Sequence, residues 1–242
     1  MIKTTELTDG QKQPLISIVI PLRNDLNKLQ DLVENIRMTS NQINIKEIIV
    51  VLNGEYDVAE YKTLAGWCTV IYSKTTQRAA AMNLGASVAQ GNILYFLHAD
   101  SILPQGFDEL IIESSKNGAG AGCFLLKFDS PSKMLKAFCL FVRLLWYWVH
   151  FGDQSLFVDA QVFTRVGGYN ENLTTMEDVD IVKRIKKCTH FEVIYKYITT
   201  SARKYETNGY FKVQIVYIIV VVLYLMRFPQ SVLLRILAQI KK

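Results

Sequence analysis

The chain has 242 residues, half of them apolar and a fifth charged, which is enough to bury a substantial core. The formal net charge is +5 and the basic residues are scattered except near the C-terminus, so no nucleic-acid partner is expected. The four cysteines form no Cys-x-x-Cys pair, which argues against a zinc knuckle or a redox motif. The polar N-terminus lacks the apolar stretch of a secretory signal, so we expect a cytoplasmic protein.

The first half of the sequence alternates apolar runs with segments of helical periodicity. We expect residues 1–13 to form a flexible tail and residues 14–242 to form a single domain, with C-terminal helices over 210–242. The predicted elements in chain order are strand Ile16–Pro21, a helix from Asp25 to about Arg37, strand Lys46–Leu52, helix Val58–Trp67, strand Cys68–Tyr72, helix Arg78–Ala89 and strand Ile93–Leu97. This alternation predicts an α/β fold with a mainly parallel sheet covered by helices on both faces.

Ligands of such open sheets bind outside the carboxyl ends of the strands. The loops that begin at Leu22, Asn53 and His98 are therefore expected to form the walls of a binding site. Accordingly, Pro21, Asn24 and Asn53, which end the first two strands, are predicted to line it.

The second half of the sequence is less regular. Its predicted elements are helix Pro104–Lys116, strand Ala121–Phe128, an aromatic helix over Ala137–Phe151, strand Ser155–Val158, helix Ala160–Val166, helix Val179–Lys187, strand Phe191–Tyr197, and helices Tyr210–Arg227 and Gln230–Ile240. Of the two apolar stretches, Ala137–Phe151 carries an arginine and Val213–Met226 is shorter than the run of about 20 apolar residues that spans a bilayer. Each is either a buried core helix or a helix in a membrane interface, with Arg227, Arg235, Lys241 and Lys242 near anionic lipid.

A buried strand runs directly into a lone carboxylate in the stretch Tyr95–Asp100, YFLHAD. Asp100 thus stands at the end of the sheet where ligands bind. A carboxylate there can hold Mg²⁺ or Mn²⁺ while water and a diphosphate take the other positions of the cation. The structural alternative for Asp100 is an N-cap of the following turn. An isolated histidine such as His98 is more often structural than a ligand.

Three carboxylates, Glu177, Asp178 and Asp180, lie close together before a run of basic residues. That order suits the dipole of a helix, so helix capping explains some of these acids, although it does not need all three. Like charges this close, when partly buried, raise one pKa toward the working range of a general base. Upstream, Asp153 and Gln154 follow the aromatic stretch and can orient an acceptor hydroxyl.

Together these blocks resemble family 2 glycosyltransferases with the GT-A fold. The resemblance extends from the first strand to the last helices and is closest to a short bacterial subgroup. The blocks that carry it are RAAAMNLGA at 78–86, FLHAD at 96–100, GDQ at 152–154, MEDVD at 176–180 and TSAR at 200–203. Each block alone is weak, but five in this order are specific.

The resemblance implies a metal-dependent transfer of a sugar from a nucleotide sugar to a hydroxyl, with inversion at the anomeric centre. The implied roles are Asp178 as catalytic base with Glu177 in support, Asp100 and His98 in the Mg²⁺ or Mn²⁺ motif, Arg78, Asn83 and Arg203 near the nucleotide or its phosphates, and Asp153 and Gln154 on the acceptor side. The sequence departs from many members at Leu52, where they have an aspartate that reads uracil. The resemblance therefore leaves the nucleotide base open.

Two alternatives remain. The missing aspartate and the apolar stretches also fit a non-catalytic membrane-surface protein that retains the sheet. The other is a nucleotidyltransferase, which would need a basic glycine-rich loop after the first strand. Residues 22–25 contain no glycine, which argues against it. The apolar C-terminal third favours a lipid-linked acceptor and an enzyme that sits peripherally on the inner face of the membrane.

Overall fold

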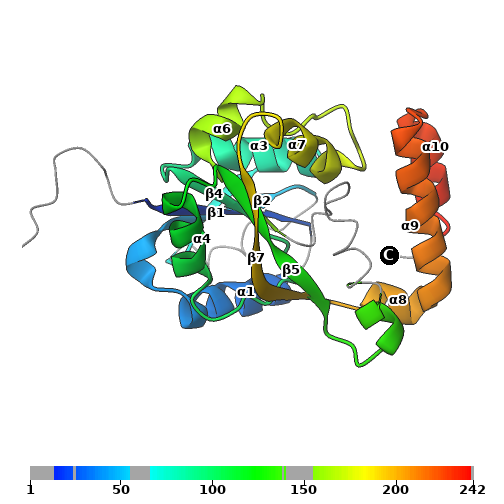
Figure 1. Ribbon diagram of the computed structural model, residues 1–242, viewed down its shortest axis with the longest axis horizontal. Helices are drawn as coiled ribbons and strands as arrows, with labels where there is room; N and C mark the ends of the chain where they lie inside the picture. Colours follow the sequence, from blue (N-terminus) through cyan, green and yellow to red (C-terminus); the bar gives the residue numbers. More distant parts are fainter. Residues whose placement is uncertain (1–13, 24–25, 55–65, 138, 140–154, 241–242) are drawn as a thin grey trace, which may run out of the picture.

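The computed structural model describes residues 14–23, 26–54, 66–137, 139 and 155–240. Its centre is a seven-stranded sheet in the order β3-β2-β1-β4-β6-β5-β7 (Figure 1). The strands are β1 (Ile16–Leu22), β2 (Ile45–Leu52), β3 (Thr69–Tyr72), β4 (Ile93–Phe96), β5 (Ala121–Phe128), β6 (Leu156–Asp159) and β7 (Phe191–Thr200). Only β6 runs antiparallel to its neighbours among these strands. The predicted α/β fold with a mainly parallel sheet is confirmed.

Helices cover both faces of the sheet because the strands are apolar on both sides. Ile18 and Ile20 of β1 point into one core, which contains α1 (Leu26–Thr39) and α4 (Phe107–Lys116). Val19, between them, points into the opposite core. That second core contains α3 (Arg78–Val88), α6 (Ala160–Arg165) and α7 (Glu177–Ile185).

The chain ends in three helices, which lie at the right of Figure 1: α8 (Arg203–Asn208), α9 (Tyr210–Leu225) and α10 (Gln230–Leu237). Val213, Val216 and Val220 of α9 are buried in the first core. Within the described ranges, no helix is both long enough and apolar enough to cross a bilayer.

Most predicted elements lie within a few residues of the observed ones. The helix predicted at Val179–Lys187 begins two residues earlier, at Glu177, because Met176 takes a left-handed conformation (φ 65°) and starts it. Strand β7 continues to Thr200, since it pairs with β5 as far as Phe128. Helix α8 and a short 3-10 helix at Gln42–Asn44 were not predicted. The helices predicted at Val58–Trp67 and Ala137–Phe151, and the tail 1–13, lie wholly or largely outside the described residues.

Candidate active site

The site lies where the order of the strands reverses. From β1 the sheet continues to β2 on one side and to β4 on the other, so the loops after β1 and β4 diverge at their carboxyl ends. Backbone bonds extend the ladder beyond the strands: Asn53 N donates to Leu22 O at 3.0 Å, and Leu97 N donates to Val19 O at 3.0 Å. The structure therefore brings the predicted residues Pro21 and Asn53 and the start of the 98–100 loop to one edge of the sheet.

Arg78, the first residue of α3, joins three separate segments at this edge. Its Nη1 donates to Asp178 Oδ2 at 3.0 Å and to Glu177 Oε1 at 3.3 Å. Its Nη2 donates to His98 Nε2. The helix reaches this position because it packs closely on the sheet at Gly85, where an added Cβ would lie 2.4 Å from Val19 Cγ1. Arg78 thus bridges both carboxylates assigned to catalysis.

The three acids at the start of α7 divide into two sets. Asp180 faces along its own helix and pairs with Arg184, with 2.8 Å between Arg184 Nε and Asp180 Oδ2. Glu177 and Asp178 face Arg78 instead. Side-chain exposure is 9% for Glu177 and 17% for Asp178, so Asp178 is the more accessible member of the pair. Asp178 Oδ1 makes no hydrogen bond within the described part of the chain, which leaves it open to a hydroxyl.

Burial, and after it the neighbouring Asp178 carboxylate, raises the pKa of Glu177 from 4.5 to about 7 against the opposing effect of Arg78. Tyr169 is buried beside these groups, and its pKa is raised by burial and then by the charge of Asp178. The Tyr169 ring packs edge-on against Phe96 of β4, with 5.1 Å between centroids. No sequence pattern indicates that Tyr169 belongs to the site, because a tyrosine after a Gly-Gly turn is usually only a core residue.

This pKa predicts a pH dependence of stability. The folded protein holds the Glu177 proton more tightly than the unfolded chain does, so the stabilisation is full below pH 4.5 and is lost as pH rises through about 7. The free energy of unfolding of the wild type, relative to a Glu177→Gln variant, should fall by on the order of 2–3 kcal/mol across this window. Urea unfolding of both proteins at several pH values measures it. A difference that does not change with pH would contradict the assignment.

Asp100 is half-buried just after β4 and makes no hydrogen bond or ion pair with the described residues. The chain beyond it crosses to the end of β7, where Ile102 N donates to Thr199 O at 2.8 Å. Arg203 begins α8 shortly afterwards, and its preceding residue is fixed by Asp129, whose Oδ1 accepts from Ala202 N at 2.6 Å. The structure thus ties the segment of Asp100 to the TSAR segment. Asp129 was not singled out from the sequence, because it lies outside the five blocks.

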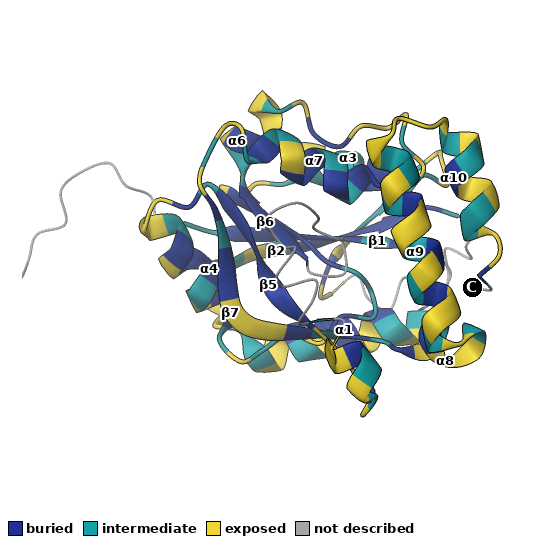
Figure 2. Cartoon of the chain, turned by 45° about the vertical axis from the view of Figure 1, so that its right-hand side comes forward, coloured by how far each residue is buried: buried dark blue, intermediate teal, exposed yellow. Residues whose placement is uncertain are grey.

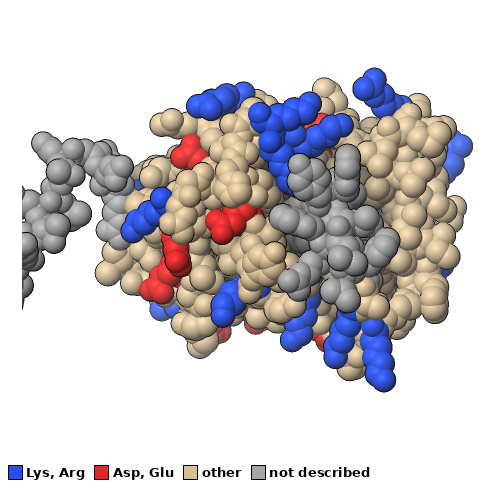
Figure 3. Space-filling view, in the orientation of Figure 1, with Lys and Arg blue, Asp and Glu red and all other residues tan. Residues whose placement is uncertain are grey.

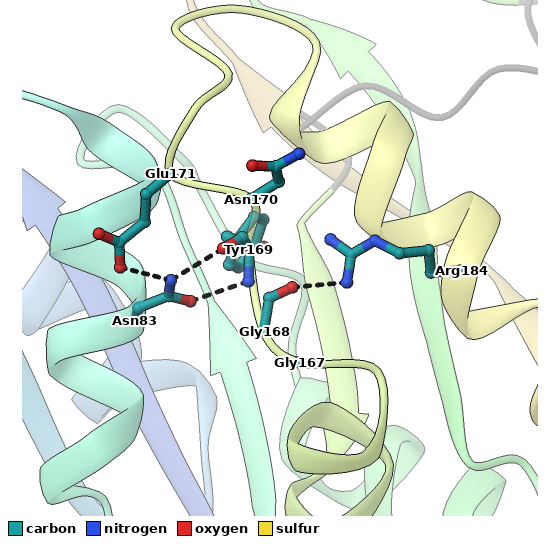
Figure 4. A pocket seen from close by; sticks show the side chains of 7 residues that line it. All are labelled: Asn83, Gly167, Gly168, Tyr169, Asn170, Glu171 and Arg184. Atoms are coloured by element: carbon teal, nitrogen blue, oxygen red, sulfur yellow. Dashed lines mark hydrogen bonds between the residues drawn. The ribbon is translucent and has the colours of Figure 1, made fainter.

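Two predicted residues have other partners in the structure. A guanidinium only donates hydrogen bonds, so the Nε2 lone pair of His98 is directed at Arg78. Asn83 lies further along α3 and holds a loop: its Nδ2 donates to Tyr169 O at 2.9 Å and to Glu171 Oε1 at 2.8 Å, and its Oδ1 accepts from Tyr169 N (Figure 4). Asn83 therefore holds the backbone of Tyr169, whose side chain is buried beside Glu177 and Asp178. The metal contact predicted for His98 and the nucleotide contact predicted for Asn83 stay predictions.

The loop held by Asn83 lines an open cavity of about 410 Å³, which Arg184 borders on the far side (Figure 4). Arg184 Nη1 donates to Gly168 O at 2.7 Å. The polar groups of this cavity thus bond to one another and hold the loop against α7. The predicted residues Asn24, Asp153 and Gln154 lie outside the described residues.

Carboxylates and a basic residue gather beyond the carboxyl ends of a mainly parallel sheet flanked by helices, an arrangement that fits the GT-A class of glycosyltransferases. The comparisons agree with this class. Residues 17–138, half of the chain, match the family model described as glycosyl transferase family 2. The chain therefore belongs to this family.

Solved structures share the fold at low sequence identity. The mannosyltransferase PcManGT from Pyrobaculum calidifontis, in complex with GDP-Man and Mn²⁺, aligns with TM-score 0.67 and 15% identity over 86% of this chain and 63% of its own. GalNAc-T7 with UDP, GalNAc and Mn²⁺ aligns with TM-score 0.62 and 14% identity over 79% and 44%. TarS from S. aureus aligns with TM-score 0.62 and 11% identity over 93% and 42%. The chain spans less than two thirds of each of these chains, and no curated protein matches its sequence.

Proposed function

We propose that this glycosyltransferase moves a sugar from a nucleotide-diphosphate donor to a hydroxyl acceptor, with inversion and with a divalent cation. The observation that carries the proposal is the accessible Asp178 carboxylate at the start of α7, held by Arg78 while Oδ1 stays open. A carboxylate so placed can accept the proton of an attacking hydroxyl. Inversion follows from a single in-line displacement at the anomeric carbon.

Asp100 is the residue that fits a cation on the donor side. Its carboxylate is half-buried and makes no bond to other described groups, so its oxygens are available. Within the described ranges, no three His, Cys, Asp or Glu side chains group to form a complete metal site. The other positions would therefore go to the donor diphosphate and to water, the arrangement usual for Mg²⁺ or Mn²⁺. When bound, the cation offsets the charge of the leaving group.

Asn53 is the candidate for contact with the nucleotide base. Its side chain is buried, its Nδ2 lies 3.5 Å from Thr76 O, and its Oδ1 has no hydrogen-bond partner within the described part of the chain. A buried acceptor without a partner costs about 1–3 kcal/mol. A ring N–H of a nucleobase would satisfy it. This supports donor binding in which the Asn53 amide replaces the carboxylate common at the end of the second strand.

Two fold neighbours bind GDP-Man and UDP, each with Mn²⁺, which supports a nucleotide-sugar donor. On the acceptor side we propose a lipid-linked hydroxyl compound, oriented by Asp153 and Gln154, used by an enzyme in the cytoplasm at the inner face of the membrane. We also place the chain in the short bacterial subgroup that shares its five sequence blocks. A screen of nucleotide sugars for Mn²⁺-dependent thermal stabilisation tests the donor proposal, because a bound donor raises the melting temperature according to its affinity.

A non-catalytic protein with the same sheet is the second candidate, because Arg78 bonds to one oxygen of Glu177 and one of Asp178, the two candidate bases. Calorimetry with nucleotide sugars and Mn²⁺ separates the two functions. A non-catalytic scaffold would show no metal-dependent heat.

Asp100→Ala tests the proposed metal site. Asp100→Ala should keep its own melting temperature, since the side chain bonds to no described group, but should lose the Mn²⁺-dependent stabilisation by donor. Differential scanning fluorimetry with donor, with and without Mn²⁺, measures both. Asp31→Ala, which removes an exposed carboxylate from α1, is the matched control and should keep the full shift. A full shift in Asp100→Ala would remove Asp100 from the metal site.

A further inference from the structure

Helix α9 has two apolar faces, and only one of them is buried. Val213, Val216 and Val220 point into the core with at most 5% exposure. The opposite face carries seven large apolar side chains that are 41–75% exposed, namely Phe211, Ile215, Ile218, Ile219, Val222, Leu225 and Met226. Their spacing follows one face of a helix, which extends this stripe over roughly 22 Å. Figure 2 shows exposed residues recurring along the outward side of α9. A monomeric soluble protein rarely leaves such a stripe in water.

The stripe continues past the end of α9. Arg227 takes a left-handed conformation (φ 63°), which ends α9 and turns the chain into α10. Phe228, 42% exposed, and Leu234, 38% exposed, follow in this turn and on α10. We name this surface, from Phe211 to Met226 with Phe228 and Leu234, the C-terminal apolar face.

The charged residues of the C-terminal segment that carries this face all have one sign. From Thr207 to the end the sequence has five basic residues, Lys212, Arg227, Arg235, Lys241 and Lys242, and no Asp or Glu. Subtracting these five from the 27 Lys and Arg leaves 22, which equals the 22 Asp and Glu, so this segment carries the whole net charge of +5. In Figure 3 the side formed by α9 and α10 is mostly uncharged, with basic residues at its margins.

We propose that the C-terminal apolar face docks on an anionic lipid bilayer. A helix with apolar residues on the outer face and Lys or Arg at the margins lies in the plane of the interface, where apolar side chains enter the acyl boundary and basic ones meet lipid phosphates. With 16 residues α9 is about 24 Å long, shorter than the roughly 30 Å hydrocarbon core, and its inner face is fixed to the protein. The helix therefore rests on the bilayer and does not cross it.

The charge pattern favours lipid over a second copy of the chain. Two copies meeting through this face would bring their basic segments together with no acidic residue from the same segments to offset them. Anionic lipid headgroups supply the opposite charge. The surface is therefore complementary to a bilayer and not to itself.

Hydrogen bonds join α10 to the segment before α7, the helix that begins with Glu177 and Asp178. Gln230, the first residue of α10, accepts hydrogen bonds at Oε1 from Thr174 N at 3.2 Å and from Thr175 N at 3.1 Å, directly before Met176 and Glu177. Burial raises the pKa of Tyr224 on α9, and the Asp180 carboxylate of α7 adds to this effect. The helices of the C-terminal apolar face are thus hydrogen-bonded to the segment directly before α7.

The test is flotation of the full chain with vesicles, which needs no donor, metal or turnover and so stands apart from the proposed transfer reaction. The wild type should float with an equimolar mixture of phosphatidylcholine and phosphatidylglycerol and far less with phosphatidylcholine alone. Ile215→Gln with Val222→Gln should lower the vesicle–water partition coefficient by roughly tenfold or more, because two exposed apolar side chains no longer enter the bilayer. Glutamine keeps the helix propensity of these positions.

Matched controls distinguish binding through this face from non-specific hydrophobic adsorption to vesicles. Met38→Gln with Ile43→Gln, which removes two even more exposed apolar side chains elsewhere, should leave flotation unchanged. Lys212→Gln with Arg235→Gln should weaken binding to the phosphatidylglycerol vesicles by roughly tenfold or more, whereas Lys116→Gln with Lys187→Gln should not. Wild-type chain that fails to float with phosphatidylglycerol, or flotation that Ile215→Gln with Val222→Gln leaves intact, overturns the proposal. A stable dimer that this double variant converts to a monomer, without any vesicle binding, also overturns it.

Discussion

Asp178→Asn should abolish sugar transfer while the protein stays folded and binds donor. The asparagine amide matches the carboxylate in size but cannot take a proton from the acceptor hydroxyl. General base catalysis typically contributes 10²–10⁴-fold, so kcat should fall by about that factor. The measurement is kcat with saturating donor and Mn²⁺, together with the melting temperature and the donor-dependent shift. Transfer at the wild-type rate would show that Asp178 is not the base.

The same helix offers a matched control for this substitution. Asp180→Asn removes an acid two residues away that pairs with Arg184 and not with Arg78. It should retain transfer within a few-fold. Glu177→Gln tests which member of the pair is the base, because the pKa of Glu177 is raised to about 7 while Asp178 is the more accessible carboxylate. A larger loss in Glu177→Gln than in Asp178→Asn would exchange the two roles.

Arg78→Met should lower both stability and rate. It leaves two close carboxylates without their shared cation, and breaking such a partly buried group costs about 2–4 kcal/mol at a pH where both are charged. It also raises the pKa of Glu177 further above its usual range, because Arg78 is the group that lowers it. The loss of stability should therefore shrink at low pH, where the carboxylates are protonated. Urea unfolding at acid and at mildly alkaline pH measures the difference.

The rate of Arg78→Met should fall by about 10²-fold, since the carboxylates and His98 lose the group that orients them. Arg184→Met is the matched control, with nearly equal exposure and a carboxylate partner on its own helix. It should lose stability without a comparable loss of rate. Equal stability of Arg78→Met and wild type at alkaline pH would show that Arg78 does not neutralise the pair.

The sheet was predictable because its strands are short apolar runs with helices between them. The strand predicted at Ala121–Phe128 matches β5, and that at Lys46–Leu52 lies within one residue of β2. Helix boundaries were harder where tertiary contacts set them. Met176 starts α7 in a left-handed conformation that its side chain does not favour, so no local pattern could predict it.

The candidate site was only partly predictable for the same reason. Asp100, Glu177 and Asp178 stand out as acids beside apolar elements or in a cluster. The pairing of Arg78 with two of these acids, and of Asp180 with Arg184, is a three-dimensional choice that three adjacent carboxylates cannot reveal. Asp129 and Gln230 act on backbone N–H groups of other segments, and such contacts leave no trace in local sequence.

Arg78 also has a consequence for how the protein folds. Its partners lie 20, 99 and 100 positions away in the chain, so these bonds close long loops and form only after the sheet has assembled and α7 has docked on it. The segment that matches the family model ends at residue 138, well before either base candidate. A folding intermediate built from the first four strands would therefore contain Asp100 but no catalytic pair. Competence for transfer should appear in the last folding phase, together with protection of the α7 amides from hydrogen exchange.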